Sequence, residues 1–330
     1  MRIIFCLLLI SISFFANSQN INDCDGPYVE YKKSQIIVRS IDSNRSAVVI
    51  DFPASDKSSH VLSVHFSNHT GWDFTVPFKT KITDEPSTWP AADKILALSD
   101  IEGEFDNFRY MLIAAHVMDS LYNWTYGNGL LVICGDLFDR GHDVAAELWL
   151  LYKLEEEAKA SGGYVHTILG NHDIMNLSGD IRFVQPRYIE NAKIIGKDYM
   201  DLYNRNSELG RWLRSKNIIE KIGDNLCLHG GISPKILKIG WTIAKINYNC
   251  RPFYDLSEHP EKFTDTTVLA FFDEDNISPF WYRGYFTEPK ATQGLVDSTL
   301  AFYQCRQIIV GHDIIDNVGT FYEDKVYGID

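Results

Sequence analysis

Hydrophobic and polar positions divide the chain into two regions with different patterns. From residue 94 onward, short apolar runs alternate with stretches in which apolar residues recur at helical spacing. Runs that are apolar on both faces predict buried strands, and the helical spacing predicts helices that cover them. The predicted strands are Ile95–Leu98, Leu130–Cys134, Val165–Leu169, Leu226–Leu228, Ile308–Val310 and Val326–Ile329. The predicted helices span about residues 105–115 and Val144–Ala160.

Residues 19–90 instead contain short β-prone runs separated by Ser, Asn, Asp and Gly, which predicts a small antiparallel β-rich region. Pro86 and Pro90 mark its end, so we expect a second domain over residues 91–330 and an α/β (α+β) fold overall. His60, His65 and His69 lie close enough in sequence to bind a metal ion. Surface or hydrogen-bonded histidines are the favoured interpretation, because the pattern gives them no Cys or carboxylate partner.

The first 18 residues have the pattern of a secretory signal peptide. A positive start at Arg2 is followed by an apolar run over residues 3–16, and Ala16 and Ser18 are the small residues expected before a cleavage site. The run is too short to cross a bilayer, and no later stretch approaches the required length. We therefore expect an exported protein, periplasmic or secreted, without a membrane span. The alternative is a buried N-terminal strand.

Removal of the signal, which contains Cys6, would leave an odd number of cysteines in the mature protein. Cys134 and Cys227 lie in predicted buried strands and are expected to be unreactive thiols. One disulfide is conceivable among the other three, with its pairing open: Cys24, Cys250 and Cys305. No CxxC motif is present, which disfavours a thiol-based metal site.

Composition narrows the classes of protein further. The 330 residues are 45% hydrophobic and 13% aromatic, enough for a large core and unlike a disordered chain or a disulfide-stapled miniprotein. The chain carries 44 acidic and 31 basic residues, a formal charge of −13. Such a charge argues against binding nucleic acid through its phosphates. It does not exclude a small anionic ligand, because a local site can have the opposite sign.

Polar clusters of similar composition follow five of the predicted strands. They are Ser99–Gly103, Gly135–Gly141, Gly170–Asp173, His229–Gly231 and Gly311–Asp313. Ligands of open α/β sheets bind at the carboxyl ends of the strands, so these clusters are expected to converge. Any single cluster is compatible with a turn or a helix cap, but five in succession favour a binding site. Their Asp, Glu, Asn and His side chains are metal-ligand types.

The series resembles the motifs GDxHG, GDxxDRG, GNHE, HGG and GH of the calcineurin-like metallophosphatases, in the group of phosphoprotein phosphatases. The longer segments GNHDIMNLSGD (170–180) and PFWYRG (279–284) are similar to those of the Shewanella-like protein phosphatases. The resemblance covers about residues 94–330 and implies a helix-flanked β-sandwich. In that family a little more chain usually follows the last strand, whereas this chain stops at Asp330, directly after the predicted strand Val326–Ile329.

The resemblance implies two divalent metal ions. Asp136 would bridge them, Asp100 would hold the first, and Asn171, His229 and His312 would hold the second. A hydroxide bridging two ions is a nucleophile at neutral pH and would attack phosphorus in line, without a catalytic Ser or Cys.

The same resemblance assigns the remaining site residues. His172 would protonate the leaving oxygen, and Asp139 would orient it and keep it protonated. Arg140 and Arg283 would bind phosphate oxygens through their guanidinium groups, together with Asn171. For Arg283 the alternative is a structural role in an aromatic loop.

One position departs from the family pattern, because Glu102 stands where the first motif has His, and Ser99 replaces its Gly. Glu102 can still ligate the first metal ion. A carboxylate in place of an imidazole favours harder ions, so Mn²⁺ is the favoured metal, with Zn²⁺, iron and Mg²⁺ as alternatives. An impaired first site and a weak enzyme form the opposing interpretation.

The sequence thus indicates an exported metal-dependent phosphomonoesterase, with a phosphorylated protein as the leading substrate, on tyrosine or on serine and threonine. The aromatic residues Trp281, Tyr282, Tyr285 and Phe286 would either stack on a phenyl ring or belong to the core. Two alternatives remain: a phosphatase or phosphodiesterase of nucleotides or other small phosphate esters, and a weakly active or non-catalytic metal-binding interaction protein.

Overall fold

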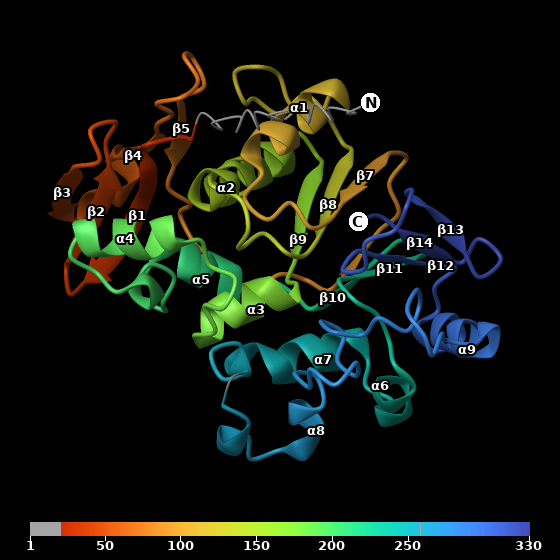
Figure 1. The fold of residues 1–330 in the computed structure, drawn as a ribbon. Helices are drawn as coiled ribbons and strands as arrows, with labels where there is room; N and C mark the ends of the chain where they lie inside the picture. The colour runs from red at the N-terminus through yellow and green to blue at the C-terminus, as the bar shows by residue number, and fades with distance from the viewer. Residues whose placement is uncertain (1–20, 258) are drawn as a thin grey trace, which may run out of the picture.

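The computed structural model describes residues 21–257 and 259–330 (Figure 1). The predicted signal peptide, residues 1–18, and Cys6 lie outside the described residues. No helix of the described part is long and apolar enough to cross a membrane.

The strands of the described residues are β1 Asp25–Lys32, β2 Gln35–Ile41, β3 Ala47–Pro53, β4 Val61–Val64, β5 Phe74–Pro77, β6 Thr88–Trp89, β7 Ile95–Leu98, β8 Leu130–Cys134, β9 Tyr164–Ile168, β10 Ile219–Ile222, β11 Asn225–Leu228, β12 Gln307–Val310, β13 Gly319–Phe321 and β14 Val326–Gly328. The α-helices are α1 Phe105–Ala114, α2 Val144–Ala160, α3 Asn171–Ser178, α4 Pro186–Ile194, α5 Glu208–Arg214, α6 Pro234–Ile239, α7 Ile243–Cys250, α8 Thr266–Leu269 and α9 Gln293–Tyr303. Short 3₁₀ helices are η1 Ala54–Ser59, η2 Tyr199–Asp201, η3 Arg251–Phe253 and η4 Pro260–Lys262.

Two sheets form the centre of the molecule. One contains the parallel strands β7-β8-β9, and the other has the order β13-β14-β12-β11-β10-β6. The bounds of β7, β8 and α2 are those predicted from the sequence.

Alternate residues of the central strands belong to different layers of the core. In β8, Val132 packs in a cluster with Ile222 and Cys227 of the opposite sheet, while Leu131 and Ile133 pack on the helix side. A period of two is the consequence of the pleat, which sends successive side chains to opposite faces. Because both faces are covered, the runs are apolar throughout. The expected α/β fold, a helix-flanked β-sandwich, is confirmed.

Helix α2 joins the sandwich to the N-terminal strands. It lies between β9 on one side and β1 and β5 on the other (Figure 1), and most of its 17 residues are buried. The N-terminal part consists of the antiparallel sheet β1-β2-β3 and the hairpin β4-β5, in agreement with the β-prone runs. Thr88 and Trp89, at the end of this part, form β6 and pair with β10 of the larger sheet. The domain division near residue 90 stays a prediction.

The five cysteines of the described residues are all free thiols. Cys134 and Cys227 are buried between the sheets, as expected. The disulfide considered among Cys24, Cys250 and Cys305 is not formed, and the first two of these thiols are buried in separate parts of the chain.

The three histidines of the N-terminal part have protein partners. His60 stacks on Phe52, His65 lies 2.7 Å from a carboxylate oxygen of Asp73, and His69 lies 2.9 Å from one of Asp106. None belongs to a candidate metal-binding group among the described residues, which agrees with the favoured interpretation.

Candidate metal centre

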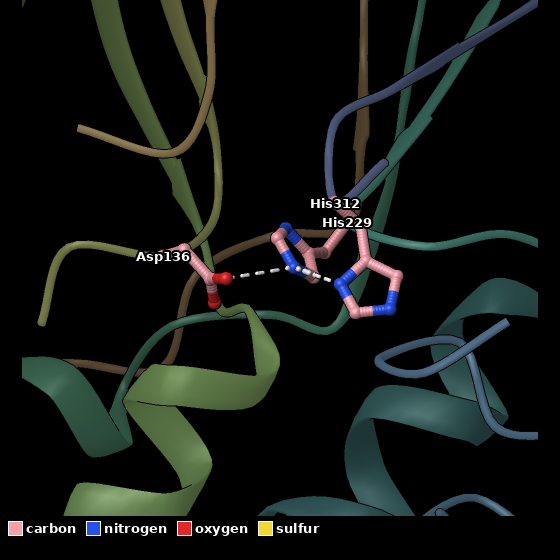
Figure 2. A group of neighbouring side chains, drawn as sticks. All are labelled: Asp136, His229 and His312. Atoms are coloured by element: carbon pink, nitrogen blue, oxygen red, sulfur yellow. Dashed lines mark hydrogen bonds and ion pairs between the residues drawn. The ribbon is translucent and has the colours of Figure 1, made fainter. Parts of the chain in front are cut away.

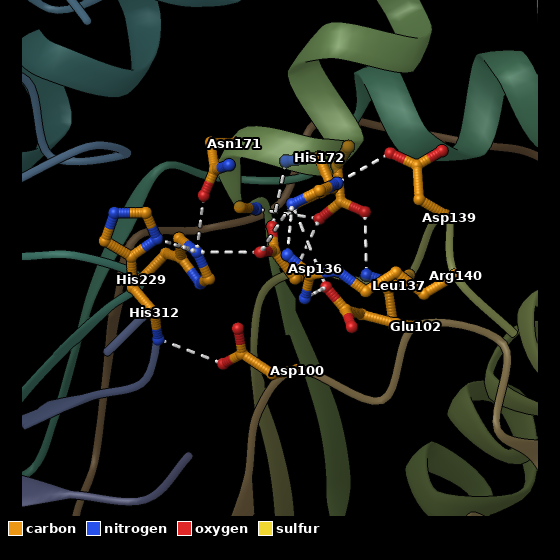
Figure 3. A network of polar contacts seen from close by, with 12 residues as sticks. Asp100, Glu102, Asp136, Leu137, Asp139, Arg140, Asn171, His172, His229 and His312 are labelled. Carbon is orange, nitrogen blue, oxygen red and sulfur yellow. Dashed lines mark hydrogen bonds and ion pairs between the residues drawn. The ribbon is translucent and has the colours of Figure 1, made fainter. Parts of the chain in front are cut away.

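The five polar clusters lie at the carboxyl ends of β7, β8, β9, β11 and β12, where they surround one point (Figure 3). Six non-glycine residues of these clusters adopt left-handed backbone, with φ between +43° and +78°: Asp100, Glu102, Asp136, Asp139, Arg140 and His312. Non-glycine residues take this conformation rarely, and its cost is accepted mainly where function requires a side-chain direction.

Glycines beside these residues allow the loops to approach one another. A Cβ atom at Gly170 would lie 2.1 Å from Oδ1 of Asp136, and one at Gly311 would lie 2.3 Å from Oδ2 of Asp100. Both separations are far below van der Waals contact. Glycine at these positions is therefore a steric requirement of the site, beyond the flexibility of a turn.

His229 lies at the centre of one group of donors. Its Nε2 is 3.1 Å from Oδ2 of Asp136, 2.8 Å from Oδ1 of Asn171 and 3.1 Å from Nδ1 of His312 (Figures 2 and 3). Its Nδ1 lies 2.8 Å from the carbonyl oxygen of Cys134. A proton on Nδ1 satisfies that carbonyl, so that Nε2 faces Asp136, Asn171 and His312 and would offer its lone pair to a cation bound among them, the arrangement typical of metal-binding histidines.

A second group shares Asp136 with the first and contains Glu102 and His172, with one ligand atom from each within 4.8 Å of the others. The backbone N–H of Glu102 donates to the carbonyl of Asp136, which fixes the two loops together. Asp100 belongs to neither of these groups of three, and its Oδ2 accepts a hydrogen bond from the backbone N–H of His312 at 3.0 Å. All six predicted metal ligands are thus brought to one centre.

His172 and Asp139 form a buried pair, with Nδ1 of His172 2.6 Å from Oδ2 of Asp139. Burial opposes protonation of His172, but the hydrogen bond that its Nδ1 donates to Asp139 and the negative charges nearby raise the pKa of the imidazole above its usual value. The Nε2 of His172 faces the centre, 3.9 Å from Oδ2 of Asp136. This orientation fits the predicted proton donor.

Two residues that support the His172–Asp139 pair, Asn176 and Tyr199, were not predicted from the sequence. Asn176 Nδ2 donates to Oδ1 of Asp139 and to the carbonyl of His172, both at 2.9 Å, and the hydroxyl of Tyr199 donates to Oδ1 of Asn176 at 2.6 Å. Asn176 is one helical turn after His172, so the i, i+4 spacing within the predicted motif was a signal for it. Tyr199 lies on a separate segment, and no local pattern connects it to the site.

Asp173 has a structural role that was not predicted from the sequence. Its carboxylate accepts hydrogen bonds from the backbone N–H groups of Gly170, Asp136 and Leu137, at 2.7, 3.1 and 2.9 Å. Burial raises the pKa of Asp173 to about 7, and the charge of Asp136 acts in the same direction. The residue ties the loop after β8 to the start of α3.

The two predicted phosphate-binding arginines lie on different sides of the centre. Arg140 pairs with Glu102, and its Nη2 is 3.3 Å from Nε2 of His172. The Nη1 of Arg283 donates to the carbonyl of His312 at 2.8 Å and to Asp313 at 2.7 Å. Both side chains are partly exposed, 54% and 41%, so that each can present donors to a ligand in solution.

The aromatic loop is divided between two environments. Tyr282 and Tyr285 are buried and pack edge to face, which assigns them to the core. Trp281 is half-buried and lies edge-on to His312, with ring centroids 5.9 Å apart. Trp281 is therefore the member of the loop that lies nearest to the candidate ligands.

The pKa shifts of the first group, Asp136, His229 and His312, show that its buried carboxylates need a positive charge nearby. Although burial acts to raise it, the pKa of Asp136 lies well below its usual value because of His229. The pKa of His229 is raised to about 10 by Asp136 and Asp100 against the effect of burial, whereas burial and the charge of His229 lower the pKa of His312 to about 2. One proton on His229 thus compensates buried carboxylates. A divalent cation would compensate them more completely, and the oxygen and imidazole donors fit such an ion.

Comparisons with known proteins agree with this geometry. Residues 93–316 match the calcineurin-like phosphoesterase family. Shewanella-like protein phosphatase 1 of Plasmodium berghei is 31% identical over 249 residues, which cover 72% of this chain and 66% of the relative. Shewanella-like protein phosphatase 2 of Arabidopsis thaliana is 36% identical over 102 residues, or 31% of this chain and 26% of the relative. The matches thus span 66% and 26% of the relatives' own length.

Among solved structures, the cold-active protein-tyrosine phosphatase of a psychrophilic Shewanella species superposes with a TM-score of 0.83 at 35% identity. The superposition covers 93% of this chain and 90% of that protein, so it extends over most of the N-terminal β-rich part as well. The expected resemblance is confirmed: with a family match over residues 93–316 and candidate ligands at five strand ends, this chain belongs to the calcineurin-like phosphoesterases.

Proposed function

We propose that the protein is an exported phosphomonoesterase that removes phosphate from phosphorylated proteins with the aid of two divalent metal ions. The observation that carries the proposal is the convergence of the candidate ligands on Asp136, beside the buried pair His172–Asp139. Metal ligands and an oriented proton donor are the two requirements of hydrolysis without a covalent intermediate.

The residues fit the metal ions as follows. Asn171, His229 and His312 would hold one ion, Asp100 and Glu102 the other, and Asp136 both. When bound, the ions would supply Lewis acidity and an acidified water at neutral pH. Mn²⁺ is the favoured ion because Glu102 adds an oxygen donor, with Zn²⁺, iron and Mg²⁺ as alternatives.

The protein's own groups would bind the substrate and transfer a proton. His172 would donate the proton on Nε2 to the leaving oxygen, while Asp139 stabilises the imidazolium through Nδ1. Arg140 and Arg283 would bind phosphate oxygens with donors that are exposed, with the amide of Asn171 beside them. In the absence of substrate, Glu102 holds the guanidinium of Arg140 at the rim of the centre.

A phosphorylated protein is favoured as substrate by the similarity to protein phosphatases, two Shewanella-like phosphatases and a protein-tyrosine phosphatase. The half-buried Trp281 beside His312 could also contact an aromatic leaving group. A nucleotide or other small phosphate ester is the alternative substrate, and a weakly active metal-binding protein is the second alternative, motivated by Glu102 in place of His.

The proposal is tested with the purified protein loaded in turn with Mn²⁺, Zn²⁺, Mg²⁺ and iron. We expect hydrolysis of a phosphotyrosine or phosphoserine peptide, and a loss of at least about 100-fold in kcat for Asp136→Asn and His172→Ala. Unchanged kcat in either variant would refute the assigned mechanism. Faster turnover of a nucleotide than of both peptides would favour the small-ester alternative, and no turnover with any metal would favour the binding protein.

A further inference from the structure

A second pocket, separate from the metal centre, has an unusual concentration of positive charge. Its volume is about 680 Å³, and its walls come from α5, α7, η3 and the segment around residue 84. Four arginines line it, Arg205, Arg211, Arg214 and Arg251, against the single acid Asp84. None of the candidate metal ligands contributes to it. Asp84 pairs with Arg251 at 3.3 Å, and Asp255 pairs with Arg205 and Arg214, so the arginines leave an excess of positive charge within a chain whose formal charge is −13.

Two of the arginines are structural. Arg214 is buried and pairs with Asp255 while donating to the carbonyls of Tyr203 and Gly210. The Nη2 of Arg251 donates to Oδ1 of Asn217 at 2.6 Å. These contacts hold the floor of the pocket in place.

The other two arginines have donors to spare. Arg205 is exposed; it pairs with Asp255 through Nε and donates through Nη2 to the carbonyl of Pro252 at 3.2 Å, which leaves Nη1 for a ligand. Arg211, also exposed, donates through Nε to the carbonyl of Arg205 and stacks on the ring of Tyr31, 4.0 Å from the guanidinium carbon to the ring centroid. No carboxylate of residues 21–257 or 259–330 pairs with Arg211. A planar guanidinium held by stacking and one hydrogen bond is oriented in advance for carboxylate or phosphate oxygens.

The buried side of the pocket also contains an unmet donor. The Nε of Arg251 is shielded from solvent and has no hydrogen-bond partner among the described residues. Buried unpaired donors are uncommon and call for a physical explanation. At the rim, Tyr248 is 78% exposed, so its ring is open to contact with a ligand.

Hydrogen bonds connect the pocket to the metal centre. Arg251 binds Asn217, and the carbonyl of Asn217 accepts a hydrogen bond at 3.0 Å from the backbone N–H of Leu169, two residues before the candidate ligand Asn171. The pocket and the centre thus adjoin the same end of β9. The link between the two sites runs through the buried residues Asn217 and Leu169.

We propose that this arginine pocket, Arg205, Arg211, Arg214 and Arg251 with Tyr248 at its rim, binds an acidic peptide segment. The inference rests on the proposed function, since that segment would flank the phosphorylated residue of a protein substrate. Arg205 and Arg211 would bind its carboxylates, and Tyr248 would cover its backbone or an apolar side chain. Binding there would lower KM for acidic substrates and leave the chemical step unchanged.

Binding is measured directly by fluorescence anisotropy of a fluorescein-labelled hexaglutamate peptide added to the full chain. We expect saturable binding that weakens with salt, and a Kd at least about tenfold higher for the double variant Arg205→Gln/Arg211→Gln. The double variant Lys290→Gln/Arg306→Gln removes the same two charges from exposed sites elsewhere and is expected to leave Kd unchanged. Tyr248→Asp serves if the double variant does not fold, because a highly exposed side chain contributes little to stability and the new charge repels the peptide.

Several outcomes separate this inference from the proposed function. Equal Kd values for the wild type, the double variant and Tyr248→Asp would overturn the arginine pocket even if the protein is a phosphatase. A loss of binding in the variants without any phosphatase activity would retain the pocket and reject the proposed function. If both hold, KM for a phosphopeptide with a glutamate tract rises in the variants, whereas kcat/KM for para-nitrophenyl phosphate does not change. Tight binding of a phosphoserine peptide that contains no Asp or Glu, together with no binding of hexaglutamate, would show that the pocket recognises phosphate. That result would reject the proposal as stated.

Discussion

At the scale of single residues, the centre depends on side chains whose directions are set by strained or glycine backbone. Asp100, Asp136 and His312 have positive φ, and Gly170 and Gly311 leave space that any larger residue would fill. The strain is compensated by hydrogen bonds such as those that Asp173 accepts from three backbone N–H groups. Residues that hold the centre together are thus as specific as the candidate ligands themselves.

Asn176 should act on catalysis through Asp139 and His172 rather than by touching substrate. Asn176→Ala removes the donor to Oδ1 of Asp139, leaving that buried oxygen without it, so we expect kcat to fall about 10- to 100-fold with a small change in KM. Tyr199→Phe removes only the hydroxyl that donates to Asn176, so we expect a smaller decrease in kcat. Steady-state kinetics on a phosphopeptide checks the order. A larger loss for Tyr199→Phe than for Asn176→Ala would contradict this arrangement.

Glu102 should determine which metal supports activity. Glu102→His replaces an oxygen donor by an imidazole and removes the ion pair with Arg140, so we expect the preference to move from Mn²⁺ toward Zn²⁺ or iron. Metal content by elemental analysis and activity after loading with each ion measure the change. Glu104→Gln, two residues away, is the control. An identical metal order in the two variants and the wild type would show that Glu102 is not a ligand.

At the scale of elements, α2 is unusual in being buried nearly all round, because it lies between the central sandwich and the N-terminal strands. Its burial includes Glu147, which is 0% exposed and accepts a hydrogen bond from the backbone N–H of Gly103 at 2.9 Å. The other carboxyl oxygen of Glu147 has no partner in the described part of the chain. Burial raises the pKa of Glu147 well above its usual value, and the charge of Asp173 adds to the effect.

This shift makes stability depend on pH in a predictable direction. The folded pKa of Glu147 exceeds the unfolded pKa of about 4.3. The stability contributed by the protonated carboxyl group is therefore fully present below that pH and is lost as pH rises toward the folded pKa. Glu147→Gln keeps the acceptor for Gly103 without a charge. We expect its free energy of unfolding to improve relative to the wild type between pH 5 and pH 8, by at most about 1.4 kcal/mol per pH unit. Urea unfolding at several pH values measures this, with the exposed Glu190→Gln as control. If the free energy of unfolding of the wild type and of Glu147→Gln depended on pH in the same way, the raised pKa of Glu147 would be disproved.

At the scale of the whole molecule, the net charge says little about the ligand. A formal charge of −13 is spread over the surface, while the arginines at the metal centre and in the arginine pocket are local. Anionic ligands respond to the field inside a cleft more than to the total charge. Assembly of the two sheets and the N-terminal strands around α2 therefore decides where an anion can bind.

Export is the prediction that concerns the whole chain. The mature protein isolated from a Gram-negative host should begin at Gln19, because Ala16 and Ser18 provide the small residues that signal peptidase requires. Intact-mass measurement of the periplasmic fraction would detect this end. Ala16→Leu places a larger side chain at the recognition position and should leave the precursor uncleaved. A wild-type protein that retains residues 1–18 in the cytoplasm would refute export.

The sequence by itself determined the local elements and the chemistry of the loops between them. Apolar runs predicted the bounds of β7 and β8, because strands covered on both faces contain few polar residues, and the two glycines Gly162 and Gly163 predicted the end of α2. The polar clusters at strand ends indicated the ligand types and the family, which the match over residues 93–316 confirms. The roles assigned to the individual site residues remain predictions.

Only the tertiary structure decided which distant side chains meet. His312 lies 3.1 Å from His229 although 83 positions separate them, and Tyr199 reaches Asn176 from a different segment. The arginine pocket gathers residues from α5, α7 and η3 that show no common pattern along the chain. The physical reason is that hydrophobic periodicity specifies which face of an element is buried, whereas contacts between elements depend on how those faces pack.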